Sequence, residues 1–251
     1  SKKPLTVTAN PKTITYGEKP ANDGVIYDGF VSGEDEKVLK GTLDFDYDYK
    51  QYDKVGSYTI TPKGLTSGNY DITFTKGTLT VERKSVTIQG VAVASKVYDG
   101  NANAAITDNG YLSANFDGEN LTFHVGTAAY DDKSVGEHKT VTFTGFSLEG
   151  PAAENYQLSG QPENTTASIT PMPVELTVTA KDKTYDGTLT AELGTVTHSG
   201  FVAGDDVQLV KGTPSFSSGD KGENIQLTFT PFTLTGKDAG NYALTQPTGV
   251  K

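Results

Sequence analysis

The sequence predicts an all-β chain that consists of three small consecutive modules. Nearly every segment alternates apolar and polar residues, as half-buried strands do; Tyr58–Thr61, Ile72–Thr75 and Leu121–Val125 are examples. Turn residues separate these segments at intervals of about eight to twelve residues, a spacing typical of β-sandwiches and related compact sheets. A weak internal repeat then divides the chain into three copies.

The repeat is clearest between the second and third copies, which align without gaps over a long stretch. Thr142–Gly150 (TFTGFSLEG) returns as Thr228–Gly236 (TFTPFTLTG), and Asn155-Tyr156 returns as Asn241-Tyr242. Upstream, the triplet that begins at Tyr98 (Tyr-Asp-Gly) returns at Tyr185. The Asp-Gly pairs of both triplets suit a turn whose glycine needs a positive φ.

The first copy is more diverged but keeps the same landmarks. Tyr16-Gly17 stands where the triplets stand, Gly29–Asp35 matches Gly200–Asp206, and Asn69-Tyr70 takes the Asn-Tyr position. We therefore place module boundaries near residues 84 and 172, which gives modules 1–84, 85–172 and 173–251.

All three copies open with a strand rich in Thr and Val, at Leu5–Thr8, Val86–Ile88 and Leu176–Thr179. The first copy closes with a strand at Gly77–Val81 and the second with one at Thr166–Thr170. The third copy has no equivalent, so we expect it to lack its last strand. We expect such a module to expose a sheet edge and to be the least stable of the three or prone to strand exchange with another molecule. The chain is otherwise expected to be a monomer.

At most one short helix is expected in each module. Ser32–Lys40 begins with a serine cap, has acids early and lysines late, and Gly204–Leu209 is a shorter echo. A helical turn that packs across a sheet would make the module β-grasp-like, whereas a module without one would be an immunoglobulin-like sandwich. The sequence leaves both alternatives open.

These motifs resemble those of the bacterial MBG and YDG repeat families. Residues 1–84 resemble an MBG module, because Tyr16-Gly17 lacks the Asp of the triplet; residues 85–172 and 173–251 resemble YDG modules. The resemblance implies a repeat segment of a secreted or cell-surface bacterial protein, without catalytic residues, that acts as a stalk or spacer in adhesion. The alternative is that one or more modules directly bind a host or environmental glycan or protein, through loops or an exposed strand edge.

The charge balance excludes some partners. With 31 acidic and 21 basic residues, the formal charge of −10 would repel nucleic acid and anionic membrane surfaces. No stretch approaches the roughly 18 apolar residues of a membrane span, so no membrane insertion of this segment is expected. The start, Ser1–Pro4, lacks the apolar core of a signal peptide, and we expect the chain to be a fragment of something longer.

No enzyme or cofactor is predicted. The absence of cysteine excludes disulfides, thiolate metal sites and cysteine nucleophiles. His124, His138 and His198 share no ligand spacing, and Gly145–Glu149 lacks the final glycine of a nucleophile elbow.

One segment carries a calcium alternative. Asp44, Asp46 and Asp48 offer carboxylate ligands at alternate positions, and hard oxygen ligands are what calcium prefers. In a strand, however, the same alternation places the intervening aromatic residues on the core face and the three acids in solvent. We favour the interpretation of this segment as a half-buried strand over that of a calcium site.

The repeated tyrosines also have two interpretations. Exposed rings could form a sugar-stacking platform, whereas a tyrosine at a turn can bury its ring and return its hydroxyl to the backbone, as in a tyrosine corner. Their place in every copy favours the structural role. The structural repeat positions are Tyr16, Tyr98, Tyr185, Asn69, Tyr70, Asn155, Tyr156, Asn241 and Tyr242.

Overall fold

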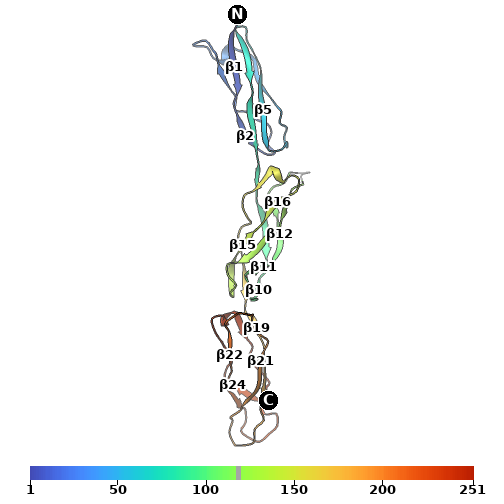
Figure 1. Ribbon diagram of the computed structural model, residues 1–251, viewed down its shortest axis with the longest axis vertical. Coiled ribbons are helices and arrows are strands. Elements are labelled where there is room, and N and C mark those ends of the chain that lie inside the picture. The colour runs from blue at the N-terminus through green and yellow to red at the C-terminus, as the bar shows by residue number, and fades with distance from the viewer. Residues whose placement is uncertain (117–119) are drawn as a thin grey trace. The chain divides into compact units, whose positions relative to one another are not determined.

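The computed structural model of the chain describes residues 1–116 and 120–251. Within these residues, regular structure consists of β-strands and of single turns of 3-10 helix (Figure 1). The predicted all-β class, with at most one short helix in each module, is confirmed.

The first module is a sandwich of two sheets. Its strands are β1 (Lys3–Ala9), β2 (Lys12–Thr15), β3 (Val25–Asp28), β4 (Lys40–Tyr47), β5 (Gly56–Thr66), β6 (Tyr70–Thr75) and β7 (Gly77–Glu82). One sheet has the order β3-β1-β6 and the other β2-β7-β5-β4. Alternate side chains of β1, which include Leu5 and Val7, are buried, as are Ile60 of β5 and Leu79 of β7. The last strand, β7, lies between β2, with which it is parallel, and β5, with which it is antiparallel.

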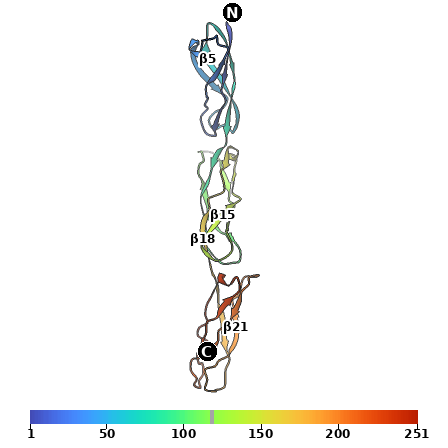
Figure 2. The ribbon, with the colours of Figure 1, turned by 90° about the vertical axis from the view of Figure 1, so that its left-hand side faces the viewer.

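The second module has shorter strands. They are β8 (Lys84–Val86), β9 (Ile88–Val93), β10 (Lys96–Val97), β11 (Asn103–Ala104), β12 (Ile106–Leu112), β13 (Thr122–His124), β14 (Thr127–Tyr130), β15 (Gly136–Thr144), β16 (Ser147–Glu149), β17 (Tyr156–Leu158) and β18 (Thr165–Thr170). Five of them form a sheet of order β10-β18-β15-β14-β11. Here β18 takes the place of β7, parallel to β10 and antiparallel to β15 (Figure 2).

The third module has only two-stranded pairs. Its strands are β19 (Met172–Val174), β20 (Leu176–Ala180), β21 (Leu193–His198), β22 (Gln208–Val210), β23 (Pro214–Phe216), β24 (Leu227–Phe229), β25 (Thr233–Thr235) and β26 (Tyr242–Leu244). The pairs β19-β26, β22-β25 and β23-β24 correspond to β8-β17, β13-β16 and β14-β15 of the second module. In the described part of this module, no strand takes the place of β18, and residues 181–187 form no strand that would correspond to β10.

Contacts group the chain into two compact units, and the division runs through the second module. One unit comprises Ser1–Gly90, Gly110–Gly126 and Gly145–Pro162, and the other comprises Val91–Asn109, Thr127–Thr144 and Glu163–Lys251. The junction between the first and second modules, at residues 82–84, lies inside the first unit. The junction between the second and third modules, at residues 170–172, lies inside the second unit.

The short helices differ from the sequence prediction. The turn η1 (Glu36–Val38) is capped by Asp35, whose side chain accepts from Lys37 N, and not by Ser32. Gly33, with φ of +86°, prevents a helix from running on from Ser32. Because η1 buries no residue, it does not pack across a sheet, and the first module is a sandwich and not β-grasp-like.

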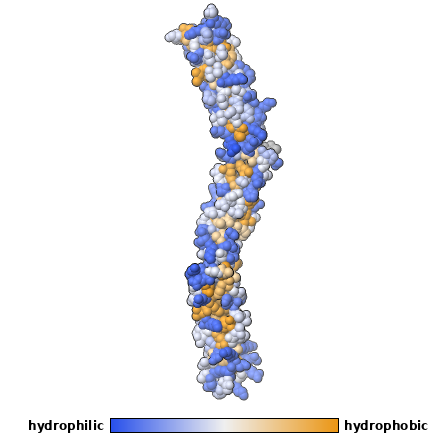
Figure 3. Space-filling view, viewed as in Figure 1, coloured by the Kyte–Doolittle hydropathy of each residue, from blue (hydrophilic) through white to orange (hydrophobic). Residues whose placement is uncertain are grey.

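The prediction of a second short helix at residues 204–209 is wrong, because this segment makes a turn and then enters β22. The other two helical turns, η2 (Ala153–Asn155) and η3 (Ala239–Asn241), directly precede the repeated tyrosines. No helix in the described ranges is long and apolar enough to cross a membrane. The visible face carries hydrophobic residues in patches that hydrophilic ones interrupt (Figure 3).

Candidate functional site: the repeated inter-module joint

The repeated residues gather at the two junctions between modules. Strand β7 ends at Glu82 and β8 begins at Lys84, so Arg83 alone links the first two modules. Strand β18 ends at Thr170 and β19 begins at Met172, so Pro171 alone links the second and third. We call the contacts around Arg83 joint 1 and those around Pro171 joint 2.

One asparagine amide closes each joint. Asn155 Oδ1 accepts a hydrogen bond of 3.1 Å from Val55 N in joint 1, and Asn241 Oδ1 accepts one of 3.0 Å from Val135 N in joint 2. The two asparagines are 6% and 7% exposed, so both are buried. Both hydrogen bonds are partly buried, and a backbone N–H that is shielded from water is costly unless it is hydrogen-bonded. Each amide therefore satisfies a donor of the preceding module.

The helical turns η2 and η3 position these asparagines. Asn155 N donates to Ala152 O, and Asn241 N donates to Asp238 O, each at 3.0 Å. The first module lacks such a turn in front of its own Asn-Tyr pair. There Asn69 N donates to Ser67 Oγ, and the asparagine side chain is exposed.

A pair of tyrosines packs edge to face in each joint. The ring centroids of Tyr16 and Tyr156 are 5.4 Å apart at an interplanar angle of 70°, and those of Tyr98 and Tyr242 are 5.5 Å apart at 74°. All four side chains are buried. This is the arrangement that aromatic quadrupoles prefer, and it adds to the area that the rings bury.

The backbone fixes the first tyrosine of each pair beside the linker. Tyr16 N donates to Glu82 O, and Tyr98 N donates to Thr170 O, both at 2.8 Å. Each acceptor is the last residue of its module's final strand. Tyr16 and Tyr98, which contact the following module, are therefore hydrogen-bonded to the strand that leads into that module.

A glycine beside each anchored tyrosine leaves room for the next module. Gly17 and Gly100 have φ of +87° and +80°, as the turn requires. A Cβ on Gly17 would collide with the ring of Phe116, and a Cβ on Gly100 would collide with a methyl of Val202. Phe116 and Val202 occupy equivalent places in successive modules, so the close approach is part of the repeat.

Joint 2 also contains a buried carboxylate. Tyr98 and Tyr242 both donate to Asp205 Oδ2 at 2.7 Å, and Lys133 Nζ lies 3.0 Å from Asp205 Oδ1. The Asp205 side chain is 1% exposed, whereas that of Lys133 is 43% exposed. Three groups from two modules thus converge on one acid.

These contacts favour the ionised carboxylate. Burial by itself would raise the pKa of Asp205, but hydrogen bonds from Tyr98, Tyr242 and Lys133 lower it below its ordinary value. Burial and the bond to Asp205 raise the pKa of Tyr242 to about 12. The pKa of Lys133 is raised by its hydrogen bond to Asp205, so both charges of the pair are present at neutral pH.

Joint 1 has polar contacts that are more exposed. Lys54 pairs with Glu154, and Arg83 Nε donates to Glu154 O at 3.0 Å. Lys84 Nζ lies 5.0 Å from the centre of the Phe116 ring. Because exposed ion pairs stabilise proteins little, the apolar cluster that includes Val81 and Tyr156 contributes more to this joint.

Family comparisons agree with this repeat. The sequence model of the YDG domain matches residues 82–166 and 170–249, which together are more than half of the chain. The chain belongs to the YDG domain family. Its first module matches the MBG domain (YGX type) over residues 5–80, and Tyr16-Gly17 agrees with that type.

No curated protein matches the chain. Among solved structures, the crystal structure of Drosophila N-cadherin EC1-3 aligns with 92% of this chain and 94% of its own, at 8% sequence identity and a TM-score of 0.23.

The hydroxyls of two Asn-Tyr tyrosines bond within their own modules. In the MBG module, Tyr70 accepts from Val31 N at 3.0 Å and donates to Glu34. In the second YDG module, Tyr242 accepts from Val202 N at 2.9 Å in addition to its bond to Asp205. Tyr185 differs from the other repeated tyrosines because its side chain is 64% exposed.

The three acids of the calcium alternative lie on the exposed face of β4 and of the turn that follows it, in the MBG module. Lys63 pairs with Asp44 at 3.5 Å and, more closely, with Asp46. Asp48 accepts from the backbone N and the hydroxyl of Thr59. No group of three or more His, Asp or Glu side chains in the described ranges is placed to hold a metal ion.

Sequence reasoning identified the repeated Tyr and Asn but missed their partners across the joints. The residues missed are Val55 and Val135, which donate to the asparagines, and Lys133 and Asp205. One signal was available: both β5 and β15 begin with a glycine that directly follows a valine. For Asp205 the indication in the sequence was weaker: the MBG module has an acid, Glu34, at the equivalent position.

Proposed function

We propose that this chain is a non-catalytic segment of a bacterial surface or secreted protein, located outside the cell, in which serial MBG and YDG modules act as a spacer in adhesion. The observation that carries the proposal is the joint, which the same repeated residues build twice. These residues hold neighbouring modules together, which is the task of a spacer.

The geometry of each joint supports this role. Linkers of one residue leave little freedom for neighbouring modules to turn, and Pro171 restricts the backbone of joint 2 further. The buried amide and the paired rings add directional contacts on top of the short linker. A module that only needed to be tethered would not need such contacts.

The absence of an enzymatic role belongs to the same proposal. YDG and MBG domains are typically non-catalytic modules. The repeated tyrosines and asparagines of both joints are engaged in contacts that hold the modules together. Asp205 is buried, as catalytic acids often are, but both of its carboxylate oxygens are already bonded to groups of joint 2.

Pulsed electron spin resonance can test the spacer function in the whole chain. The chain has no cysteine, so Lys37→Cys and Ser147→Cys would introduce two unique spin-label sites, one on each side of joint 1. We expect a narrow distance distribution that Asn155→Ala broadens. Asn69→Ala, at the same motif position but exposed, is the matched control. Equal distributions for the two alanine variants would contradict the proposal.

The alternative function is direct binding of a host or environmental glycan or protein by one or more modules. It predicts saturable binding of the purified chain to a glycan array or to host cells. A spacer predicts none, because its modules present no ligand site of their own. These two assays therefore separate the two functions without any variant.

A further inference from the structure

The MBG module pairs its first and last strands along a single parallel ladder. Strand β1 lies parallel to β6, with Lys3 opposite Tyr70, and β2 lies parallel to β7, with Lys12 opposite Leu79. The two partners of each pair are equally far apart along the chain, so the register does not change where the strands pass from one sheet to the other. We call this pairing of β1 and β2 with β6 and β7 the clamp.

The clamp extends over the full length of these strands. It begins where Lys3 N donates to Asn69 O at 2.9 Å and ends where Tyr16 N donates to Glu82 O at 2.8 Å. Six residue pairs join β1 to β6 and four join β2 to β7. The neighbouring strands add antiparallel pairs, four between β3 and β1 and five between β5 and β7. All of these strands lie within one compact unit.

This geometry decides how the module responds to a pull on its two ends. The chain enters at the first residue of β1 and leaves at the last residue of β7, which are opposite ends of the clamp. Since the paired strands are parallel, a pull at these two points draws them past each other along their own direction. Backbone hydrogen bonds run across the strands, so the pull loads those of the clamp together instead of one after another.

Side chains oppose the same movement. Alternate residues of the clamp are buried, Leu5 and Val7 in β1 and Leu79 and Val81 in β7. Ile14 of β2 belongs to the same apolar cluster as Leu79 and Val81. Because a shift of one residue between paired strands turns inward side chains outward, the strands cannot slide without exposing this apolar surface.

The first YDG module has a shorter parallel pairing. Three residue pairs join β8 to β17 and two join β10 to β18. Lys84 lies opposite Tyr156 but Lys96 lies opposite Ile169, so the register shifts by one residue between the two pairings. Strand β9, which lies between β8 and β10 in the chain, pairs with β12 instead. The parallel pairing of this module is therefore interrupted as well as short.

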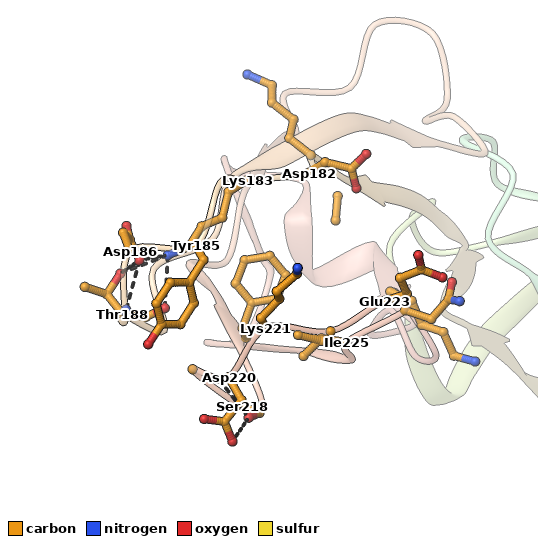
Figure 4. Close-up of a pocket in the computed structure, with 17 residues that line it drawn as sticks. Asp182, Lys183, Tyr185, Asp186, Thr188, Ser218, Asp220, Lys221, Glu223 and Ile225 are labelled. Carbon is orange, nitrogen blue, oxygen red and sulfur yellow. Dashed lines mark hydrogen bonds and ion pairs between the residues drawn. The ribbon is translucent and has the colours of Figure 1, made fainter.

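The side chain at one equivalent position differs as well. Where the MBG module has Ile14, two residues before its repeated tyrosine, the YDG modules have Lys96 and Lys183. Lys96 pairs with Asp99 at 2.7 Å, in the turn that follows it. Lys183 pairs with Asp186 at the same distance (Figure 4). An ion pair inside one turn, unlike a buried isoleucine, does not hold the first strand of a module to its last.

We propose that the MBG module bears mechanical load, and that its clamp resists a tension that unfolds the first YDG module. The inference deepens the proposed spacer function, since a spacer between a cell and a bound target is under tension. It does not depend on stiff joints. Its failure and that of the spacer function are therefore separate results, because a force measurement decides the one and spin-label distances decide the other.

Single-molecule force spectroscopy of the full chain measures the resistance of each module. The chain has no cysteine, so Ser1→Cys with Arg83→Cys places the two handles on either side of the MBG module alone. Arg83→Cys with Pro171→Cys does the same for the first YDG module, and all three positions are exposed. At equal pulling speed, we expect the MBG module to unfold at about twice the force of the YDG module, in proportion to the parallel pairs that are loaded together.

A second direction of pull on the MBG module provides the control. Gly68 lies just before β6, is exposed and has room for a side chain. Handles on Ser1→Cys and Gly68→Cys lie at the same end of the clamp, so a pull separates β1 from β6 one pair at a time. We expect this force to be several times lower than that of Ser1→Cys with Arg83→Cys. Equal forces in the two directions, or a first YDG module that resists as strongly as the MBG module, would overturn the proposal.

Discussion

Asn155 and Asn241 hold the two joints by one amide oxygen each. Both accept from the backbone N of a valine that belongs to the preceding module. The motif position is the same as that of Asn69, which is exposed and has no such donor. The energetic role of this repeated asparagine therefore depends on whether another module is in contact with it.

Asn155→Ala should lower the free energy of unfolding by about 0.5–1.5 kcal/mol, because Val55 N loses its acceptor in a partly buried place. Urea unfolding of the full chain, followed by tyrosine fluorescence, measures the change. Asn69→Ala should change the stability by less than about 0.5 kcal/mol, as exposed substitutions usually do. Equal losses in the two variants would show that the amide bond to Val55 is not the cause.

Asp205→Asn should lower the free energy of unfolding by about 2 kcal/mol at neutral pH, because the bonds to a charged acid become bonds to a neutral amide. The pKa of Asp205 is lowered by folding, so the stability that its charge contributes is present above the unfolded value of about 4. It is lost as the pH falls through the lower value of the folded chain.

The difference in stability between the native chain and Asp205→Asn should therefore be constant from about pH 5 to pH 8 and shrink below about pH 4. Urea unfolding at a series of pH values measures it. The exposed neighbour Asp206, changed by Asp206→Asn, provides the control. A difference that grows as the pH falls would have the wrong sign for this carboxylate.

At the scale of elements, strand β4 and the turn after it carry the three acids of the calcium alternative. These acids are exposed; Lys63 pairs with Asp44 and Asp46, and Thr59 donates to Asp48. Hydrogen bonds from Thr59 lower the pKa of Asp48, and a backbone hydrogen bond lowers the pKa of Asp44. Carboxylates that are already engaged by protein groups are poor candidates for a metal site.

We therefore expect removal of calcium with EDTA to leave the melting temperature of the chain unchanged, and millimolar calcium to leave it unchanged as well. Differential scanning calorimetry in the two buffers measures this. A shift of several degrees that Asp46→Asn abolishes would instead support a calcium site on β4.

The strands could be predicted because apolar and polar residues alternate along them with a period of two. Segments such as Leu5–Thr8 and Thr166–Thr170 lie within β1 and β18. The helical turns were not predictable in the same way. A single turn buries little, so its position depends on one capping side chain and on glycine φ values, as Asp35 and Gly33 show.

At the scale of the whole molecule, a repeat shows which positions share a role but not which contacts they make. Tyr98 and Tyr242 are far apart in the sequence, and either could have packed inside its own copy. Packing between modules decides the matter, and a pattern within one copy contains no information about it. This is why the repeated residues were predicted as structural while their partners across the joints were not.

The joints also connect the stabilities of the modules. Each is built from two half-sites that belong to different modules, so a module that unfolds removes buried partners from its neighbour. In repeat proteins, contacts of this kind make the free energy a sum of module and interface contributions. For this chain, the interface contribution is concentrated in the tyrosine pair and the asparagine of each joint.

The one-residue linkers have a consequence for how such proteins change in length. Strands run into both Arg83 and Pro171 from either side, and successive side chains of a strand point in opposite directions. One inserted residue would therefore turn the inward side chains of the next strand outward. A lineage that needs a longer or shorter protein can accept the gain or loss of an entire copy far more easily than a single added residue between copies.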